Sequence, residues 1–196
     1  MRTSDAITER RAIRSYKPDP VPEDAVRRLL EAAVRAPTAM HGEPWSFVVI
    51  QDRALLKKLS ELAKATWSPA RDGSHAVATA RQPSEGHASA LLSAPEFNIF
   101  YDAGTLIAIC GRPLNAFVTA DCWLAAENLM LAARAEALGT CPIGFAVPVL
   151  NRPEVKTALG IPPDVAVVAP IIVGTPREWT PPTSRKPPEV VCWHRG

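Results

Sequence analysis

The chain has 196 residues, of which 47% are hydrophobic, and its formal net charge at neutral pH is +2. This length suits a single globular domain over residues 1–196, and so small a net charge does not indicate a polyanion partner such as nucleic acid. The longest apolar run, residues 165–173, is far shorter than the roughly 20 residues of a membrane-spanning helix. Residues 1–14 are polar and charged, unlike a signal peptide. We therefore expect a cytoplasmic protein with neither nucleic-acid nor membrane partners.

The first part of the chain predicts helices and one strand. Ser4 or Asp5 caps a short helix that ends near Arg11. The next segment is extended towards Lys17, because a residue before proline avoids the helical region. The pattern then predicts, in order, a helix that Pro22 opens and that ends at 36–37, a loop over 36–45, a strand over 46–51 and a helix that Asp52 caps. Residues 67–89 show no clear pattern and suit a lid or a surface loop.

The second part is organised around a long helix, 117–138, which contains neither glycine nor proline and is apolar nearly all round. Such a helix belongs inside a core or a subunit interface. Gly139 is expected to form its left-handed C-cap. The remaining predictions are a strand over 105–110, a helical turn over 90–94, a short strand or loop over 141–145, a helix over 152–159 that Asn151 caps and Gly160 closes, and a strand over 165–173.

Proline punctuates the end of the chain. Pro170 lies within the strand over 165–173, which indicates an edge position or a bulge. A proline-rich arm, 176–188, precedes a predicted final strand over 189–193. Strands separated by helices predict a three-layer α/β or α+β sheet. The final strand has no local partner, so we expect the arm to reach across to a second subunit.

Common catalytic motifs are absent from the sequence. It contains no G-x-G-x-x-G, no G-x-x-x-x-G-K-[ST], no H-E-x-x-H and no G-x-S-x-G. Cys192 and His194 face one side of the predicted strand, but no further Cys/His pair accompanies them, so no metal site is expected. We interpret the four cysteines, none of them in a C-x-x-C pair, as reduced structural thiols.

Basic residues cluster near both ends of the chain. Arg10, Arg11 and Arg14 lie near the start, and Arg185 and Lys186 lie near the end. Two small cationic clusters suit a small anion better than a nucleic acid. Ordinary solvated surface charge explains them equally well at this point.

Four stretches together resemble the FMN-dependent nitroreductase family. RRAIRSY (10–16) is similar to its R-R-S-[IV]-R-x-[FY] opening, and APTAMHGEPWSFVVI (36–50) to A-P-S-x-x-N-x-Q-P-W-x-F. The third is the long helix with Asp121 and Asn128, running into LGTCPIG (138–144). The fourth is 160–176 followed by 184–193. They occur in the family's order and spacing over nearly the whole chain, except for 67–89.

The resemblance implies an α+β, three-layer α-β-α fold. Its central mixed sheet is flanked by helices, and its C-terminal arm and strand are exchanged in a homodimer. It also implies FMN in two interface sites and NAD(P)H as reductant. Arg10 and Arg185 match phosphate contacts, and Arg14 matches a cation near the ribityl chain or the pyrimidine edge. The implied cofactor-binding set is Arg10, Arg11, Ala12, Arg14, Pro37, Thr38, Ala39, His41, Pro142, Ile143, Gly144 and Arg185. No catalytic side chain is expected, because the flavin carries the chemistry.

Some residues depart from the family pattern. Ala12 replaces a hydroxyl, His41 and Glu43 replace Asn and Gln, and Pro142 replaces a common Trp. We expect Glu43 to pair with Arg11 or Arg14, because an unpaired buried carboxylate is costly. These departures affect the expected substrate more than the expected cofactor.

The resemblance implies hydride transfer from NAD(P)H through flavin N5 to small nitroaromatic or quinone-like acceptors. One alternative keeps the fold and changes the reaction to that of a flavin-dependent dehydrogenase or a flavin-fragmenting oxygenase. The other is a non-catalytic flavin-binding dimer.

Overall fold

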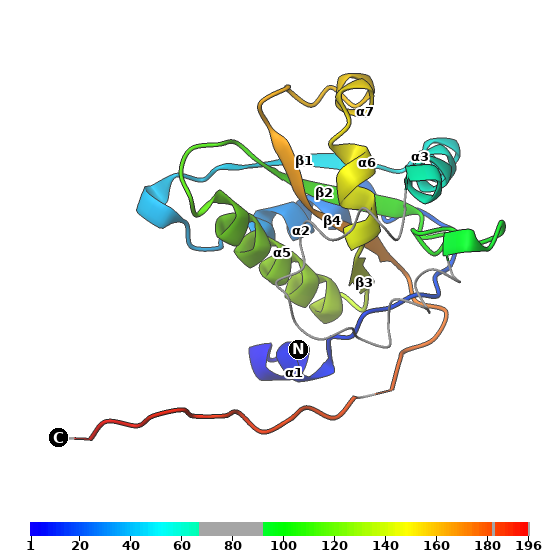
Figure 1. Ribbon diagram of the computed structural model, residues 1–196. Helices are drawn as coiled ribbons and strands as arrows, with labels where there is room; N and C mark the ends of the chain where they lie inside the picture. The colour runs from blue at the N-terminus through cyan, green and yellow to red at the C-terminus, as the bar shows by residue number, and fades with distance from the viewer. Residues whose placement is uncertain (67–91, 182, 196) are drawn as a thin grey trace.

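The computed structural model describes residues 1–66, 92–181 and 183–195 (Figure 1). The segment 67–89, for which a lid or a loop was predicted, lies wholly outside the described residues, as does the start of the turn predicted over 90–94. The helices are α1 (Thr3–Glu9), α2 (Glu23–Ala33), α3 (Arg53–Thr66), α5 (Val118–Ala135), α6 (Val147–Leu150) and α7 (Pro153–Ala158). The strands are β1 (Trp45–Ile50), β2 (Thr105–Gly111), β3 (Gly139–Pro142) and β4 (Ala166–Gly174), and two 3-10 turns are η1 (Ala39–His41) and η3 (Gly144–Ala146).

The four strands form one sheet in the order β1-β2-β4-β3, with antiparallel neighbours throughout. All seven residues of β2 are buried, because both faces of the sheet are covered. Alternate side chains of β2 enter separate cores: Leu106 packs with α3 and α6, whereas Ile107 packs with α2 and α5. The α+β class and the three layers are therefore confirmed.

Pairing within the sheet differs from the predicted mixed arrangement. Among the described residues, parallel pairing is limited to an isolated bridge between Ala12 and Thr140. Pro170 lies in β4, an inner strand, and the register of β2 and β4 shifts nearby, between Ile109 and Cys110. The alternative of a bulge is thus confirmed, and the alternative of an edge strand is wrong. The carbonyl of Pro170 accepts from the Ile143 amide just beyond the end of β3 (2.8 Å).

The ends of the helices confirm one predicted cap and contradict two others. Asp52 caps α3, because its Oδ1 accepts from the amides of Ala54 and Leu55. Asn151 does not cap α7; its side chain instead accepts from the Val167 amide and donates to the Val147 and Val167 carbonyls. Ala137, with φ of 58°, takes the left-handed position after α5 that was predicted for Gly139.

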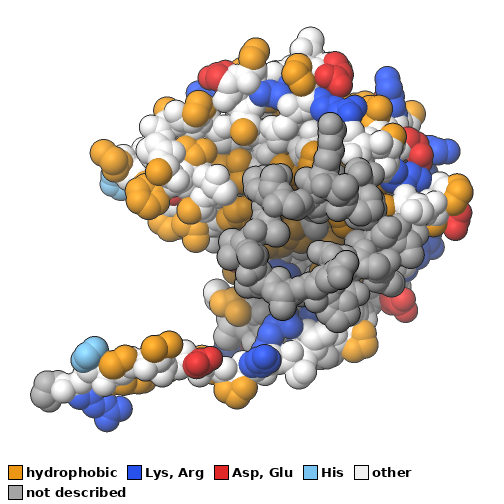
Figure 2. Space-filling view, in the orientation of Figure 1, with side chains coloured by type: hydrophobic (Ala, Val, Ile, Leu, Met, Phe, Trp, Pro, Cys, Tyr) orange, Lys and Arg blue, Asp and Glu red, His pale blue; other side chains and the backbone are white. Residues whose placement is uncertain are grey.

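The C-terminal arm is anchored only where it leaves the sheet. The Lys17 amide donates to the Thr175 carbonyl (2.9 Å), the Arg177 amide donates to the Ser15 carbonyl (3.1 Å), and the Trp179 ring lies 4.0 Å from the Arg134 guanidinium. Beyond Trp179 the described residues run away from the body and expose apolar side chains (Figures 1 and 2). The strand predicted over 189–193 does not form in the single chain, because no strand lies beside it.

Buried thiols should make the protein sensitive to alkali. Burial raises the pKa of Cys110 to about 11 and that of Cys122 to about 12, from an ordinary 9.0. The unfolded chain therefore loses these protons first, and the free energy of unfolding should fall as pH rises above about 9. Urea unfolding between pH 8 and pH 11 measures this slope.

Two variants provide the controls for this prediction. Cys122→Ala should reduce the slope, whereas substitution of the exposed Cys192 by Ser should leave it unchanged. At pH 8 a thiol reagent should modify Cys192 alone until the protein is denatured. An unfolding free energy that stays constant up to pH 11 would contradict the burial of these thiols.

Candidate functional site

The N-terminal arginine segment is held against the edge of the sheet. Ala12 bridges to Thr140 in β3, and the Ile13 amide donates to the Thr140 carbonyl (3.0 Å). Ile13 and Tyr16 are buried, and the Tyr16 hydroxyl donates to the Ile13 carbonyl (2.7 Å). Burial raises the pKa of Tyr16, so its hydroxyl stays protonated. These contacts fix the backbone from which Arg10, Arg11 and Arg14 project.

The three arginines differ in their partners. Arg10 lies 3.7 Å from the carboxylate of Glu127. Arg11 donates through Nη1 to the carbonyls of Thr8 and Arg10, and its Nε is buried without a partner. Arg14 is exposed and makes no ion pair with any carboxylate of the described residues. The segment therefore keeps cationic donors free for an anionic ligand.

The turn after β3 offers main chain to the same end of the sheet. Pro142 ends β3, Ile143 is buried, and Gly144 opens the turn η3. A Cβ added at Gly144 would meet no atom within 4 Å, so the space beside this backbone is open. A planar ligand can approach such a turn closely.

The loop that carries Pro37, Thr38, Ala39 and His41 is held at the start of α5 and not at β3. The Ala39 amide donates to Oδ1 of Asp121 in the first turn of α5 (3.2 Å). Within or just after the short turn η1, three non-glycine residues adopt positive φ, namely Met40, His41 and Glu43. Met40 at the apex is 92% exposed. The loop is thus a projection that is tied to α5 and exposes its apex.

Helix α5 separates the loop from the arginine segment. Asp121 holds the loop at one end, whereas Arg134 near the other end pairs with Glu9 of α1. Arg10 itself faces Glu127, which is six residues along α5 from Asp121, or roughly 9 Å of helix. Figure 1 shows the loop and α1 at opposite ends of α5. The loop and the arginine segment therefore contact different stretches of α5.

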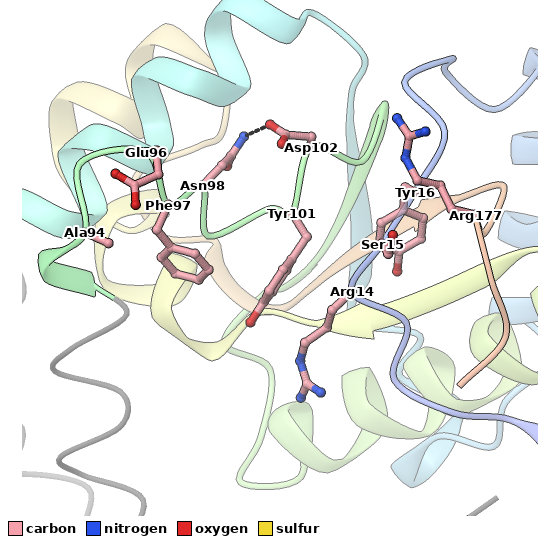
Figure 3. A pocket seen from close by; sticks show the side chains of 10 residues that line it. All are labelled: Arg14, Ser15, Tyr16, Ala94, Glu96, Phe97, Asn98, Tyr101, Asp102 and Arg177. Carbon is pink, nitrogen blue, oxygen red and sulfur yellow. Dashed lines mark hydrogen bonds between the residues drawn. The ribbon is translucent and has the colours of Figure 1, made fainter. Parts of the chain in front are cut away.

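A pocket adjoins Arg14 on the side away from α5 (Figure 3). Its walls are Arg14, Ser15, Tyr16 and Arg177 on one side and Ala94, Glu96, Phe97, Asn98, Tyr101 and Asp102 on the other. The rings of Phe97 and Tyr101 meet edge to face, with centroids 5.4 Å apart. The Arg14 guanidinium lies 6.0 Å from the Tyr101 ring centroid.

Comparison with known proteins establishes the family. The sequence profile of the Nitroreductase family matches residues 7–175. A Thermus thermophilus protein named NADH dehydrogenase is 30% identical, over 96% of this chain and 94% of its own. A Rhodospirillum rubrum protein named 5,6-dimethylbenzimidazole synthase is 32% identical, over 90% of this chain and 83% of its own. A Bacteroides fragilis nitroreductase, solved with bound FMN, superposes with a TM-score of 0.79 at 24% identity, over all of both chains.

The chain belongs to the nitroreductase family. This membership confirms the class predicted from the motifs, an FMN-dependent NAD(P)H oxidoreductase. The structure brings together the family's arginine segment, Ala12 and the Pro142–Gly144 turn. It places Pro37, Thr38, Ala39 and His41 in a separate loop that is held at the start of α5.

Two sequence expectations about this nitroreductase do not hold within the single chain. Arg185 does not lie beside Arg10 or Arg14; it is exposed on the arm and donates to the hydroxyl of Thr183 (2.9 Å). Glu43 is exposed and pairs with neither Arg11 nor Arg14, because η1 carries it away from both.

Sequence reasoning missed Tyr101. It lies in the segment 100–104, just before β2, and no motif marks it.

The structure also shows no cluster of metal ligands, and no helix with the length and hydropathy to cross a membrane, among the residues it describes.

Gly139 and Gly144 allow a matched test of the site. A Cβ at Gly139 would lie 2.8 Å from Cγ1 of Ile13 and 2.9 Å from Cγ of Pro176, both in segments packed on β3. Gly139→Ala should therefore cost about 1–3 kcal/mol of unfolding free energy. Gly144→Ala should change stability by less than about 0.5 kcal/mol but weaken FMN binding. Urea unfolding of the apoprotein and FMN titration measure the two effects. Equal stability losses in the two variants would contradict this.

Proposed function

We propose that this nitroreductase-family protein is a homodimer with two FMN sites, each built from both subunits, and that it reduces nitroaromatic or quinone-like acceptors. The observation that carries the proposal is that the loop is held at the start of α5 with its apex exposed, whereas the arginine segment is held at β3. One subunit would supply the arginine segment and the turn after β3. The other would supply the loop with Thr38 and His41.

The residues present fit FMN. A flavin phosphate is a dianion that suits bidentate guanidinium donors. Arg10 is only loosely paired, the Arg11 Nε is buried without an acceptor, and Arg14 is free of carboxylates among the described residues. In this proposal Arg10, Arg11 and Arg185 hold the phosphate, and the open main chain at Gly144 lies against the ring.

When bound, FMN supplies hydride transfer between the nicotinamide and the acceptor. The protein's part is to bind and orient it. The Ile143 amide already donates to the Pro170 carbonyl, so the Gly144 amide would be the one to donate towards the ring, and the Arg14 cation would stabilise negative charge at the pyrimidine edge. The partner's loop, with Met40 at its apex, covers the ring and limits water. No side chain has to transfer a proton at the reacting atom.

Exposed apolar surface supports the dimer. The outer face of α5 and the segment before it expose Leu114, Phe117, Trp123 and Leu124. The tail exposes Val190, Val191 and Trp193, and β1 is an edge strand that pairs only with β2 among the described residues. Contiguous exposed apolar side chains of this kind mark an interaction surface. In the proposal, α5 packs against its symmetry mate and the arm crosses to the partner.

The proposal can be tested on the purified full chain. We expect a yellow dimer by sedimentation, with FMN released on denaturation. Under argon, NADH or NADPH should bleach the flavin absorbance, and a quinone or a nitroaromatic should restore it. A monomer that binds FMN stoichiometrically would exclude the composite site. A flavin that no nicotinamide reduces would favour the non-catalytic alternative.

Similarity to two relatives favours a second candidate reaction, in which the flavin itself is consumed. The Rhodospirillum rubrum relative at 32% identity and a Rhodobacter capsulatus relative at 31% are both named 5,6-dimethylbenzimidazole synthase. That compound contains the dimethylbenzene ring that flavins carry, so an enzyme of this kind would consume its flavin with oxygen. Incubation of the reduced holoprotein under air and under argon, followed by chromatography of the small molecules, separates the two reactions. Loss of flavin under air alone, with a dimethylbenzimidazole product, would replace the first proposal.

Two further expectations stay predictions. These are the cytoplasmic location and the single domain over residues 1–196; the family match covers residues 7–175.

A further inference from the structure

Arg14 has different neighbours from five other arginines of this chain. Arg10, Arg27, Arg28, Arg134 and Arg152 all lie within 4 Å of a carboxylate. Arg14 instead lies against the ring of Tyr101, 6.0 Å from its centroid, and close to the thiol of Cys141. Both neighbours are uncharged at neutral pH, because burial raises the pKa of each group while the Arg14 cation only partly opposes that effect.

Tyr101 is presented to Arg14 from a constrained turn. Tyr101 and Asp102 adopt positive φ, 51° and 55°, which is unusual for two consecutive non-glycine residues and strained for an aromatic one. Residues held in such conformations persist only when their surroundings enforce them, and they cluster at functional sites.

The surroundings that enforce this turn are visible. Asn98 accepts from the Phe100 amide and donates to the Asp102 carboxylate, both at 2.9 Å. Phe100 is fully buried. On the far side, a Cβ at Gly104 would lie 2.5 Å from the Asp19 carbonyl oxygen, so the chain is packed tightly there as well. The turn therefore holds Tyr101 rigidly while its side chain projects into the pocket.

Figure 3 shows the result. The Tyr101 hydroxyl points towards the Arg14 guanidinium, and the Phe97 ring supports the Tyr101 ring from the other side. A cation needs some contact to hold one orientation. A carboxylate would provide it at the cost of neutralising the charge, whereas a phenol orients the guanidinium and leaves its charge available.

We propose that Tyr101 is a positioning residue that holds the Arg14 guanidinium towards the flavin without neutralising it. The inference rests on the proposed function, in which Arg14 stabilises negative charge on the reduced flavin. Loss of the Tyr101 hydroxyl should therefore lower the FMN midpoint potential and weaken FMN binding about two- to ten-fold, the range that the net contribution of one hydrogen bond supports.

Tyr101→Phe is the primary test, because it preserves the ring and the fold. The ring centroid is near the outer limit of cation–π contact, so the hydroxyl is expected to carry most of the effect, and Tyr101→Leu should resemble Tyr101→Phe. Phe97→Leu is the matched control. It removes the ring that supports Tyr101 without touching Arg14, and its effect should be smaller. Potentiometric titration and FMN titration of the apoprotein are the readouts, and thermal unfolding checks the fold.

Combining these changes with Arg14→Ala distinguishes a failure of the proposed Arg14 role from a failure of the proposed Tyr101 role. Arg14→Ala should lower the midpoint potential more than Tyr101→Phe does, and adding Tyr101→Phe to it should produce no further change. An unchanged potential in Arg14→Ala would overturn the proposed role of Arg14 itself. A shift in Arg14→Ala together with wild-type behaviour in both Tyr101 variants would overturn the positioning role alone. A Tyr101→Phe effect that persists without Arg14 would also overturn it, since Tyr101 would then act independently.

Discussion

Deleting residues 180–196 should abolish dimerisation and FMN retention while leaving the subunit folded. The anchored part of the arm ends at Trp179, whose ring packs on Arg134. Side-chain interactions of the described tail residues stay within the tail, such as Arg185 with Thr183 and Cys192 with His194. The deletion therefore removes no described contact of the subunit core, but it removes Arg185 and the apolar tail.

Sedimentation, flavin absorbance and urea unfolding of the truncated chain measure these three effects. A full-length variant with Val190→Ser and Val191→Ser is the matched control. It keeps Arg185 and should weaken the dimer without removing the phosphate contact. A truncated protein that remained a flavin-loaded dimer would contradict both the arm exchange and the role of Arg185. A truncated protein that unfolded would show that the tail is part of the subunit core.

Arg185→Ala should weaken FMN binding by about 1.5–3 kcal/mol, which is the contribution of a hydrogen bond to a charged group and corresponds to roughly 10- to 150-fold in Kd. The side chain is exposed in the single chain and donates only to Thr183, so the substitution should leave the unfolding free energy unchanged. Lys186→Ala, one residue along the same exposed arm, controls for general loss of positive charge. Equal effects of the two substitutions, or an unchanged Kd for Arg185→Ala, would exclude a specific phosphate contact.

Sequence patterns predicted correctly the helices, strands and caps that depend on interactions between residues close in sequence. The apolar run of β2 gives a fully buried strand, and the helix over 117–138 forms within about three residues of its predicted ends. Asp52 caps its helix because that hydrogen bond needs only neighbouring amides. The arginine segment lies beside β3, next to the turn that the family resemblance assigned to the same site, and its role in binding stays a prediction.

Other features depend on contacts that a local pattern does not contain. Gly139 was predicted as a helix cap, but it is required where Ile13 and Pro176 pack against β3, and Ala137 takes the left-handed position instead. Glu43 was expected to pair with an arginine, yet the conformation of η1 directs it to solvent. Tyr101 carries no motif, and its proximity to Arg14 arises only because two distant segments meet at the pocket.

The attachment of the loop and the arginine segment to different stretches of α5 would, with the proposed composite site, have a genetic consequence. A chain defective in the arginine segment and a chain defective in the loop over 37–41 would each form homodimers without an intact site. Mixed in one dimer, they would place both defects in one site and leave the other site whole. Two inactive alleles of this gene would then complement each other, because half of the sites in every heterodimer would be intact. Two alleles damaged at the same end of α5 would not.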